Sequence, residues 1–92
     1  MNRQALDLST EYAAPRDAVE QQLAELWAAR LEVEPIGIHD DFFELGGDSL
    51  LAAELQLAID QLFGVEVPTW TLFLSPTVAE LAATIVAELA SA

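Results

Sequence analysis

The chain has 92 residues, of which 53% are hydrophobic, and its 16 acidic and 3 basic side chains give a formal net charge of −13. The apolar content excludes a disordered acidic tail, and the charge disfavours binding to nucleic acid or to an anionic membrane while it favours protein partners with basic patches. With no cysteine, one histidine and no apolar run long enough for a signal peptide or a membrane span, the sequence predicts one small domain, monomeric and cytoplasmic, without a metal site.

A first helix is predicted after Pro15, which suits the first turn of a helix, and it ends before Pro35. Asp17 and Glu20 are favourable near the positive end of its dipole. The apolar residues that recur at helical spacing are Val19, Leu23, Leu26, Trp27 and Leu31. This face, Trp27 included, is expected in the core. Residues 1–14 show no periodicity and predict a flexible leader before a folded domain at 15–92.

Residues 32–48 show neither helical nor strand periodicity over their whole length, and glycine and proline interrupt them. A connection this long in a small domain is either functional or disordered. Its apolar residues, which argue against disorder, are Ile36, Ile38, Phe42 and Phe43. We therefore expect an ordered loop with one short turn at 41–45, and at least one phenylalanine anchored in the core.

Three polar residues in this loop, His39, Asp40 and Asp41, are adjacent and resemble the beginning of a metal or base site. Since no fourth ligand is evident, we expect a solvated group of side chains and no metal.

A second helix is predicted from Ser49 to about Phe63, because Asp48 is a good N-cap and Gly64 a good C-terminal stop. Residues 65–68 alternate like a strand, but they end in proline and have no partner strand. A short helix is expected around 69–74.

A last helix opens at Thr77, whose spacing to Glu80 predicts a capping box. Its apolar stripe is Val78, Leu81, Ala82, Ile85 and Leu89. The predicted fold is therefore all-α, a small four-helix bundle of three long helices and one short helix, with a long ordered loop between helices one and two.

Two strips of residues are predicted on the second helix. At 100° per residue, the arc expected to pack on the first and last helices is Leu51, Leu55, Ala58, Ile59 and Leu62. The second strip, beside Ser49, is Leu50, Ala53 and Leu57, flanked by Glu54 and Asp60. An apolar strip with acidic edges is typical of a partner-docking surface. For Leu50 alone, packing beneath the 32–48 loop is an equal alternative.

Ser49 itself lies in the first turn of a helix after two glycines, where its side chain is expected to be exposed. Backbone N–H groups and the helix dipole favour a phosphate at this position. A serine that begins a helix is nevertheless usually a simple cap or first-turn residue, so the wider sequence decides its role.

That wider sequence resembles the carrier domains of nonribosomal peptide synthetases. The motif LGGDSL at 45–50 follows DDFF and precedes SPTVAEL in the last helix. Trp27 in the first helix and GVEVP after the second also fit in order, so the resemblance covers 14–92. Asp48 departs from the histidine common before this serine, which leaves the partner set open.

The resemblance implies that Ser49 receives 4′-phosphopantetheine from coenzyme A through a magnesium-dependent phosphopantetheinyl transferase. The thiol of that arm would hold an aminoacyl or peptidyl group as a thioester, and the domain itself would catalyse nothing. Implied partners are an adenylation enzyme and condensation or tailoring enzymes.

Three alternatives stay open from the sequence. Acyl carriers of polyketide or fatty-acid pathways share the Asp-Ser-Leu centre, although the FFELGG loop favours the peptidyl type. Residues 47–50, Gly-Asp-Ser-Leu, also match the motif of a serine esterase family, but that chemistry needs a base beside the serine and no histidine follows Ser49. The third alternative is an acidic helical adaptor without a prosthetic group.

Overall fold

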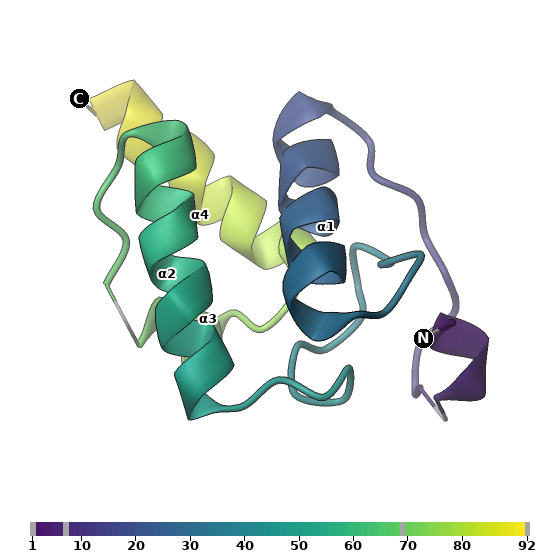
Figure 1. The fold of residues 1–92 in the computed structure, drawn as a ribbon. Coiled ribbons are helices and arrows are strands. Elements are labelled where there is room, and N and C mark those ends of the chain that lie inside the picture. Colours follow the sequence, from purple (N-terminus) through teal and green to yellow (C-terminus); the bar gives the residue numbers. More distant parts are fainter. Residues whose placement is uncertain (1, 7, 69, 92) are drawn as a thin grey trace.

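Helices are the regular elements of the computed structural model, which describes residues 2–6, 8–68 and 70–91. In chain order they are the 3₁₀ turn η1 (Arg3–Ala5) and the α-helices α1 (Ala18–Leu31), α2 (Ser49–Phe63), α3 (Thr71–Leu74) and α4 (Val78–Ser91), as Figure 1 shows. The described residues contain no strand, and their one isolated bridge joins Asn2 to Glu34. The predicted all-α bundle is confirmed. Residue 69, the predicted start of the short helix, lies outside the described residues.

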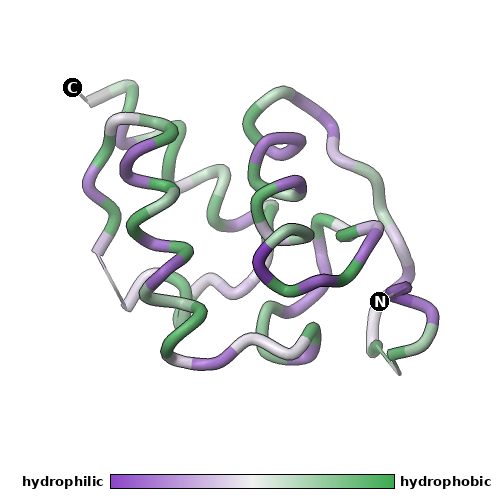
Figure 2. The backbone as a smooth tube through the Cα atoms, viewed as in Figure 1, coloured by the Kyte–Doolittle hydropathy of each residue, from purple (hydrophilic) through white to green (hydrophobic). Residues whose placement is uncertain are grey.

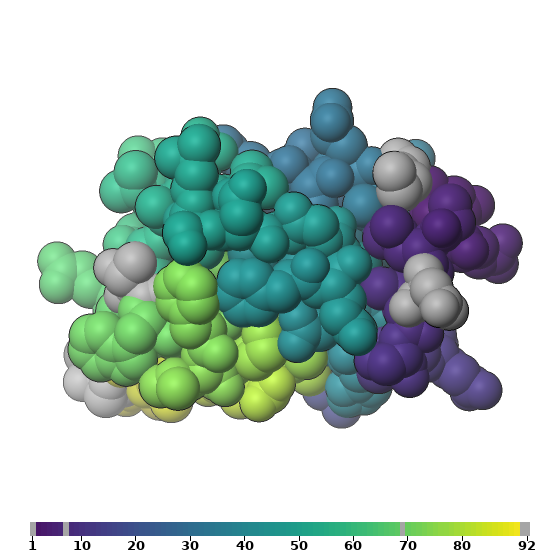
Figure 3. Space-filling model, turned by 90° about the horizontal axis from the view of Figure 1, so that it is seen from below, coloured from purple at the N-terminus to yellow at the C-terminus, as the bar shows by residue number. Residues whose placement is uncertain are grey.

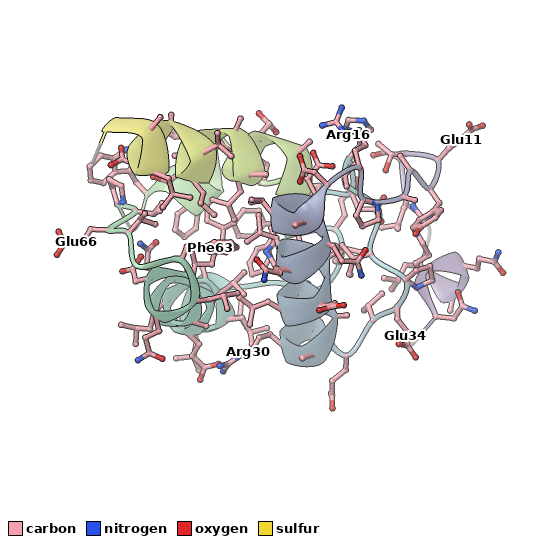
Figure 4. All side chains as sticks on the ribbon, turned by 90° about the horizontal axis from the view of Figure 1, so that it is seen from above. Glu11, Arg16, Arg30, Glu34, Phe63 and Glu66 are labelled. Carbon is pink, nitrogen blue, oxygen red and sulfur yellow. The ribbon has the colours of Figure 1, made fainter. Side chains whose placement is uncertain are left out.

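The central helix of the bundle is α1, because it packs against both α2 and α4. In Figure 1 α1 and α2 stand side by side and α4 passes behind them. Figure 2 shows hydrophobic and hydrophilic residues alternating along the long helices, as expected where one face of each helix is buried. In Figure 4 the Phe63 side chain lies between α2 and α4, where it packs against the core.

The core contains side chains from α1, α2 and α4 and from the 32–48 loop. Its fully buried apolar residues include Leu23, Trp27, Ile38, Phe42, Leu45, Leu55, Val78, Leu81 and Ile85. The Trp27 and Phe42 rings meet edge to face, with centroids 5.3 Å apart, a preferred geometry for aromatic pairs. The predicted burial of Trp27 and the anchoring of the loop by a phenylalanine are both confirmed.

Local sequence signals set the helix ends. The Asp17 carboxylate accepts from the Glu20 N–H at 2.9 Å and caps α1, so Pro15 precedes the helix and does not lie in its first turn as predicted. At the end of α2, Gly64 adopts a left-handed φ of 68°, which glycine tolerates at little cost. Thr77 Oγ1 accepts from the Glu80 N–H at 3.2 Å, which confirms the N-cap of the predicted box, and the Thr77 hydroxyl, rather than its N–H, donates to Glu80 Oε1 at 2.9 Å.

Two of the residues predicted to face the core are exposed. Leu62 in α2 is 49% exposed and Leu89 in α4 is 44% exposed. Each lies in the last turn of its helix, and the angle on a helical wheel does not tell whether a neighbouring element extends that far along the axis. Ala52, which the predicted arc omitted, is buried on the inner side of α2.

Two carboxylates are buried among the described residues, and each is paired with an arginine. Arg16 Nη2 lies 2.6 Å from Glu20 Oε2, and Arg3 Nη2 lies 2.6 Å from Asp40 Oδ1. The predicted solvated group at 39–41 is therefore wrong for Asp40, which has no exposed surface. Its partner Arg3 is 37 residues away in the sequence, so no local pattern could reveal the pair.

Both buried carboxyls have pKa values below their usual range. Hydrogen bonds from the Arg16 guanidinium lower the pKa of Glu20, although burial opposes them. Burial acts to raise the pKa of Asp40, but hydrogen bonds from Arg3, the Gly37 N–H and Thr10 outweigh it. Both groups therefore stabilise the fold most when they are ionised.

The first prediction concerns acid unfolding. A carboxyl with a lowered folded-state pKa contributes stability that is complete above its unfolded pKa, about 3.9 for aspartate, and is lost as the pH falls through the folded value. The free energy of unfolding should decrease below about pH 5, and Asp40→Asn should reduce that dependence. Denaturant titrations between neutral pH and pH 3 measure both slopes. Glu66→Gln, at an exposed carboxylate, controls for the lost charge, and an equal slope in Asp40→Asn and wild type would contradict the prediction.

The described residues of the predicted flexible leader make hydrogen bonds to the 32–48 loop. Arg3 and Thr10 donate to Asp40, and Ser9 Oγ donates to the Glu44 carboxylate at 2.9 Å. The sequence did not indicate these contacts, because isolated polar side chains leave no periodic pattern. Met1 and Asp7 lie outside the described residues.

Candidate functional site

Ser49 is the first residue of α2, and its side chain is exposed. The preceding Asp48 has an extended backbone, and its carboxylate accepts from the Leu51 N–H at 2.9 Å. Asp48 is therefore the predicted N-cap, and it satisfies one N–H of the first turn. Within the part of the chain that the structure describes, the Ser49 hydroxyl makes no hydrogen bond.

Two glycines bring the chain to Ser49, and each is needed for a different reason. Gly46 has a φ of +102°, where L-residues are strained. At Gly47 packing excludes any larger residue, because a Cβ there would lie 2.2 Å from Cε2 of the buried Phe42 ring. The backbone must pass directly over that ring before α2 begins.

The loop before the glycines is held at both sides of Phe42. The Phe42 N–H donates to the Pro76 carbonyl at 2.7 Å, which joins the loop to the start of α4, and the Gly47 N–H donates to the Phe42 carbonyl at 3.0 Å. Asp41 accepts from the Phe43 and Leu45 N–H groups, through Oδ1 and its carbonyl respectively, and closes the short turn predicted here. The entry to α2 is thus fixed by the core.

The predicted docking strip on α2 is exposed. Leu50 is 70% exposed and Leu57 is 64% exposed, and Ala53 and Glu54 are also exposed. The alternative that Leu50 packs beneath the loop is wrong. Asp60 is only partly exposed, and its Oδ1 accepts from the Val67 N–H at 3.2 Å. This bond connects α2 to the segment before α3, a role that the sequence did not indicate.

Sequence reasoning missed an exposed aromatic group on and beside α3. Trp70 is 62% exposed, and Phe73 and Leu74 are exposed as well. The ring of Phe43 stacks on that of Phe73, with centroids 5.3 Å apart. Figure 3 shows this face, with the loop and the start of α2 in teal beside α3 in green. The signal was the run WTLFL at 70–74, since a four-residue helix cannot bury so many large side chains.

Among the described residues, no catalytic pair that would support the esterase alternative is found at Ser49. No described side chain donates to or accepts from Ser49 Oγ, and His39 is exposed on the 32–48 loop. No cluster of three metal-ligating side chains occurs among the described residues. None of the described helices is both long and apolar enough to cross a membrane.

The region that contains this serine, its helix cap and the preceding glycine pair matches a known family. Residues 21–85 match the family described as a phosphopantetheine attachment site. The chain belongs to this family. The prosthetic group of the family is 4′-phosphopantetheine, and this match, together with the relatives described next, confirms the resemblance to peptidyl carrier domains predicted from the motifs.

The chain spans only a small part of the length of the synthetases that it matches. Tyrocidine synthase 3 of Brevibacillus parabrevis is 47% identical over 78 residues, which cover 85% of this chain and 1% of that protein. A peptidyl carrier protein solved in complex with the phosphopantetheine transferase Sfp and coenzyme A is 41% identical, with a TM-score of 0.81, covering 83% of this chain and 99% of that one. A prototype peptidyl carrier domain of modular peptide synthetases is 43% identical, with a TM-score of 0.73, covering 82% and 99%.

Proposed function

We propose that Ser49 is the phosphopantetheine attachment residue and that the chain, with residues 15–92 as the carrier domain, is a peptidyl carrier that catalyses no reaction itself. The observation that carries this proposal is the free, exposed hydroxyl of Ser49 at the capped start of α2, inside the region that matches the family. Residue 92 lies outside the described residues.

The residues around Ser49 fit a phosphodiester. The Ser49 and Leu50 N–H groups make no hydrogen bond within the described part of the chain, and the positive end of the α2 dipole lies there. The Asp48 carboxylate accepts a hydrogen bond from the Leu51 N–H, which orients it toward the first turn of α2. When bound, phosphopantetheine supplies a thiol that holds an acyl group as a thioester. The chain supplies the tether, which raises the effective concentration of that group at each partner.

The proposed partners follow from the relatives. The first proposed partner is a phosphopantetheinyl transferase, since one similar carrier was solved with Sfp. The second is an adenylation enzyme, since another similar structure joins an adenylation and a carrier domain. Condensation or tailoring enzymes would act on the thioester. A cytoplasmic location and a monomeric state complete the proposal.

The experiment that tests this function is enzymatic loading. Incubation with coenzyme A, Mg²⁺ and a transferase of broad specificity is expected to add the mass of one phosphopantetheine group per chain. Peptide mapping by mass spectrometry should locate it on the peptide that contains Ser49. No mass increase, or a group attached elsewhere, would contradict the proposal.

A further prediction concerns the docking strip on α2, which we propose binds the adenylation enzyme. Leu57→Arg should leave the melting temperature within about 3 °C of wild type, since exposed substitutions typically change stability by no more than about 0.5 kcal/mol. It should slow aminoacyl loading roughly tenfold, the effect expected when one apolar anchor of an interface is lost.

Leu89→Arg on α4 is the matched control, because it adds the same charge at an exposed leucine of another helix. Unfolding of Leu57→Arg would show that the strip is part of the core. Equal loading of Leu57→Arg and Leu89→Arg would show that the strip takes no part in docking.

A further inference from the structure

The N-terminal strap, by which we mean residues 2–6 and 8–13, runs along the loop that leads to Ser49. The Arg3 N–H donates to the Glu34 carbonyl at 3.0 Å, and the Ile38 N–H donates to the Ala13 carbonyl at 3.0 Å. Figure 3 shows the strap in purple against the blue and teal residues of the loop. The strap precedes residues 21–85, so it is not part of the region matched to the family.

The strap supplies most of the hydrogen bonds of the buried Asp40. Arg3 Nη2 and Nε donate to Oδ1 and Oδ2 of Asp40 at 2.6 and 3.0 Å. Thr10 Oγ1 donates to Oδ1 at 2.9 Å, and the Gly37 N–H donates to Oδ2 at 2.9 Å. Three of these four bonds therefore come from the strap, and the fork of the arginine binds both carboxylate oxygens, as in other strong pairs.

Asp40 without Arg3 would be a buried charge with no counter-ion. Arg3 is the partner that neutralises it, and the cation is itself held in place, with its guanidinium donating to the Thr10 carbonyl at 3.2 Å and lying 5.4 Å from the centre of the Tyr12 ring. Removing one member of a buried pair is strongly destabilising because the remaining charge is left uncompensated. The local order of the loop thus depends on residues far away in the sequence.

The loop transmits this dependence toward the attachment site. Asp40 is followed at once by the turn around Phe42, whose ring is buried and lies beneath Gly47. Gly47 in turn bonds to the Phe42 carbonyl and leads directly into the Asp48 cap and Ser49. A loosened residue 40 would disturb the turn that fixes the entry to α2.

We propose that Arg3 is a positioning residue for the attachment site. Its ion pair with Asp40, which we call the clasp, joins the strap to the loop and holds the loop in the conformation that presents Ser49. This inference rests on the proposed function of Ser49. The clasp couples the strap, which lies outside the family match, to the residue that carries the prosthetic group.

Amide hydrogen exchange on the full chain tests the clasp. Arg3→Met keeps an apolar side chain and removes the charge. It should lower the exchange protection of the Phe42 and Gly47 amides by at least about tenfold. The change at the centre of α1 should be smaller, since local opening affects a contiguous unit. Asp40→Asn in the same chain should restore part of this protection, because no uncompensated charge remains. Protection within twofold of wild type in Arg3→Met, or no recovery in the double variant, would overturn the clasp.

Arg16→Met is the matched control, since it removes the arginine that pairs with the other buried carboxylate, Glu20 at the start of α1. It should leave the protection of Phe42 and Gly47 unchanged. Equal loss of protection in Arg3→Met and Arg16→Met would show general destabilisation and would overturn the specific role of Arg3.

Loading by the transferase tests the link to Ser49. Arg3→Met should load at least about threefold more slowly, and the Asp40→Asn double variant should recover part of the rate, in parallel with exchange. Loosened loop amides with an unchanged loading rate would overturn the positioning role. Failure of the proposed function would be seen differently, as absence of loading in wild type, and the exchange measurements would still decide the clasp.

Discussion

Ser49→Ala is expected to abolish phosphopantetheine loading while the fold stays intact. The hydroxyl is the nucleophile in the proposed transfer, and alanine offers no oxygen to form the phosphodiester. The cap of α2 is made by the Asp48 carboxylate and not by Ser49, and alanine is the best helix former. The melting temperature should stay within about 3 °C of wild type, as for other exposed substitutions. Mass spectrometry after incubation with coenzyme A and a transferase, together with thermal unfolding, measures both effects.

Thr84→Val is the matched control, because it removes another side-chain hydroxyl, one that donates to the Glu80 carbonyl within α4, away from the strap and the loop. This variant should load like wild type. A mass increase in Ser49→Ala would show that another residue carries the group. Loss of loading in both variants would show that a general defect, and not the missing Ser49 hydroxyl, stops the reaction.

Trp27→Ala is expected to destabilise the fold more than any other single substitution that we consider. Trp27 has no exposed surface and meets Phe42 edge to face. Truncation of a buried tryptophan costs about 3–5 kcal/mol, a large part of the roughly 5–15 kcal/mol that stabilises a typical domain. Since about 1 kcal/mol shifts the melting temperature of a domain this small by roughly 4–8 °C, that temperature should fall by more than about 12 °C.

Trp27→Phe separates aromatic packing from the rest of the side chain. The indole Nε1 is buried and has no hydrogen-bond partner among the described residues, so phenylalanine removes an unsatisfied donor as well as volume. Its melting temperature should therefore lie much closer to wild type than that of Trp27→Ala. If Trp27→Ala melts like wild type, the inner face of α1 has been assigned wrongly.

The bounds of α2 could be predicted from the sequence because both of its ends are determined locally. Asp48 and Gly64 each provide a cap whose effect reaches no further than the neighbouring turn. Burial near the helix ends could not be predicted in this way. Leu62 and Leu89 continue the apolar periodicity, but whether a side chain is covered depends on a neighbouring element and not on its own helix.

The candidate site was also predictable only in part. Ser49 and the strip with Leu50 and Leu57 follow from the motif and from helical geometry, and the structure places these side chains at the surface. Asp40 was misjudged because its counter-ion lies 37 residues earlier. Trp70 was missed because a tryptophan in an apolar run is more often buried than exposed, and only the shortness of α3 distinguishes the two cases.

The contrasting environments of the two tryptophans give the molecule two natural fluorescence reporters. Trp27 lies wholly inside the core, whereas Trp70 is 62% exposed beside α3. Trp27 should emit at shorter wavelength and resist aqueous quenchers until the chain unfolds, while Trp70 should be quenched readily. In a Trp27→Phe background, a change in emission would report an event at the surface of α3. In a Trp70→Phe background, it would report loss of the core, so that association and unfolding could be followed separately without any added dye.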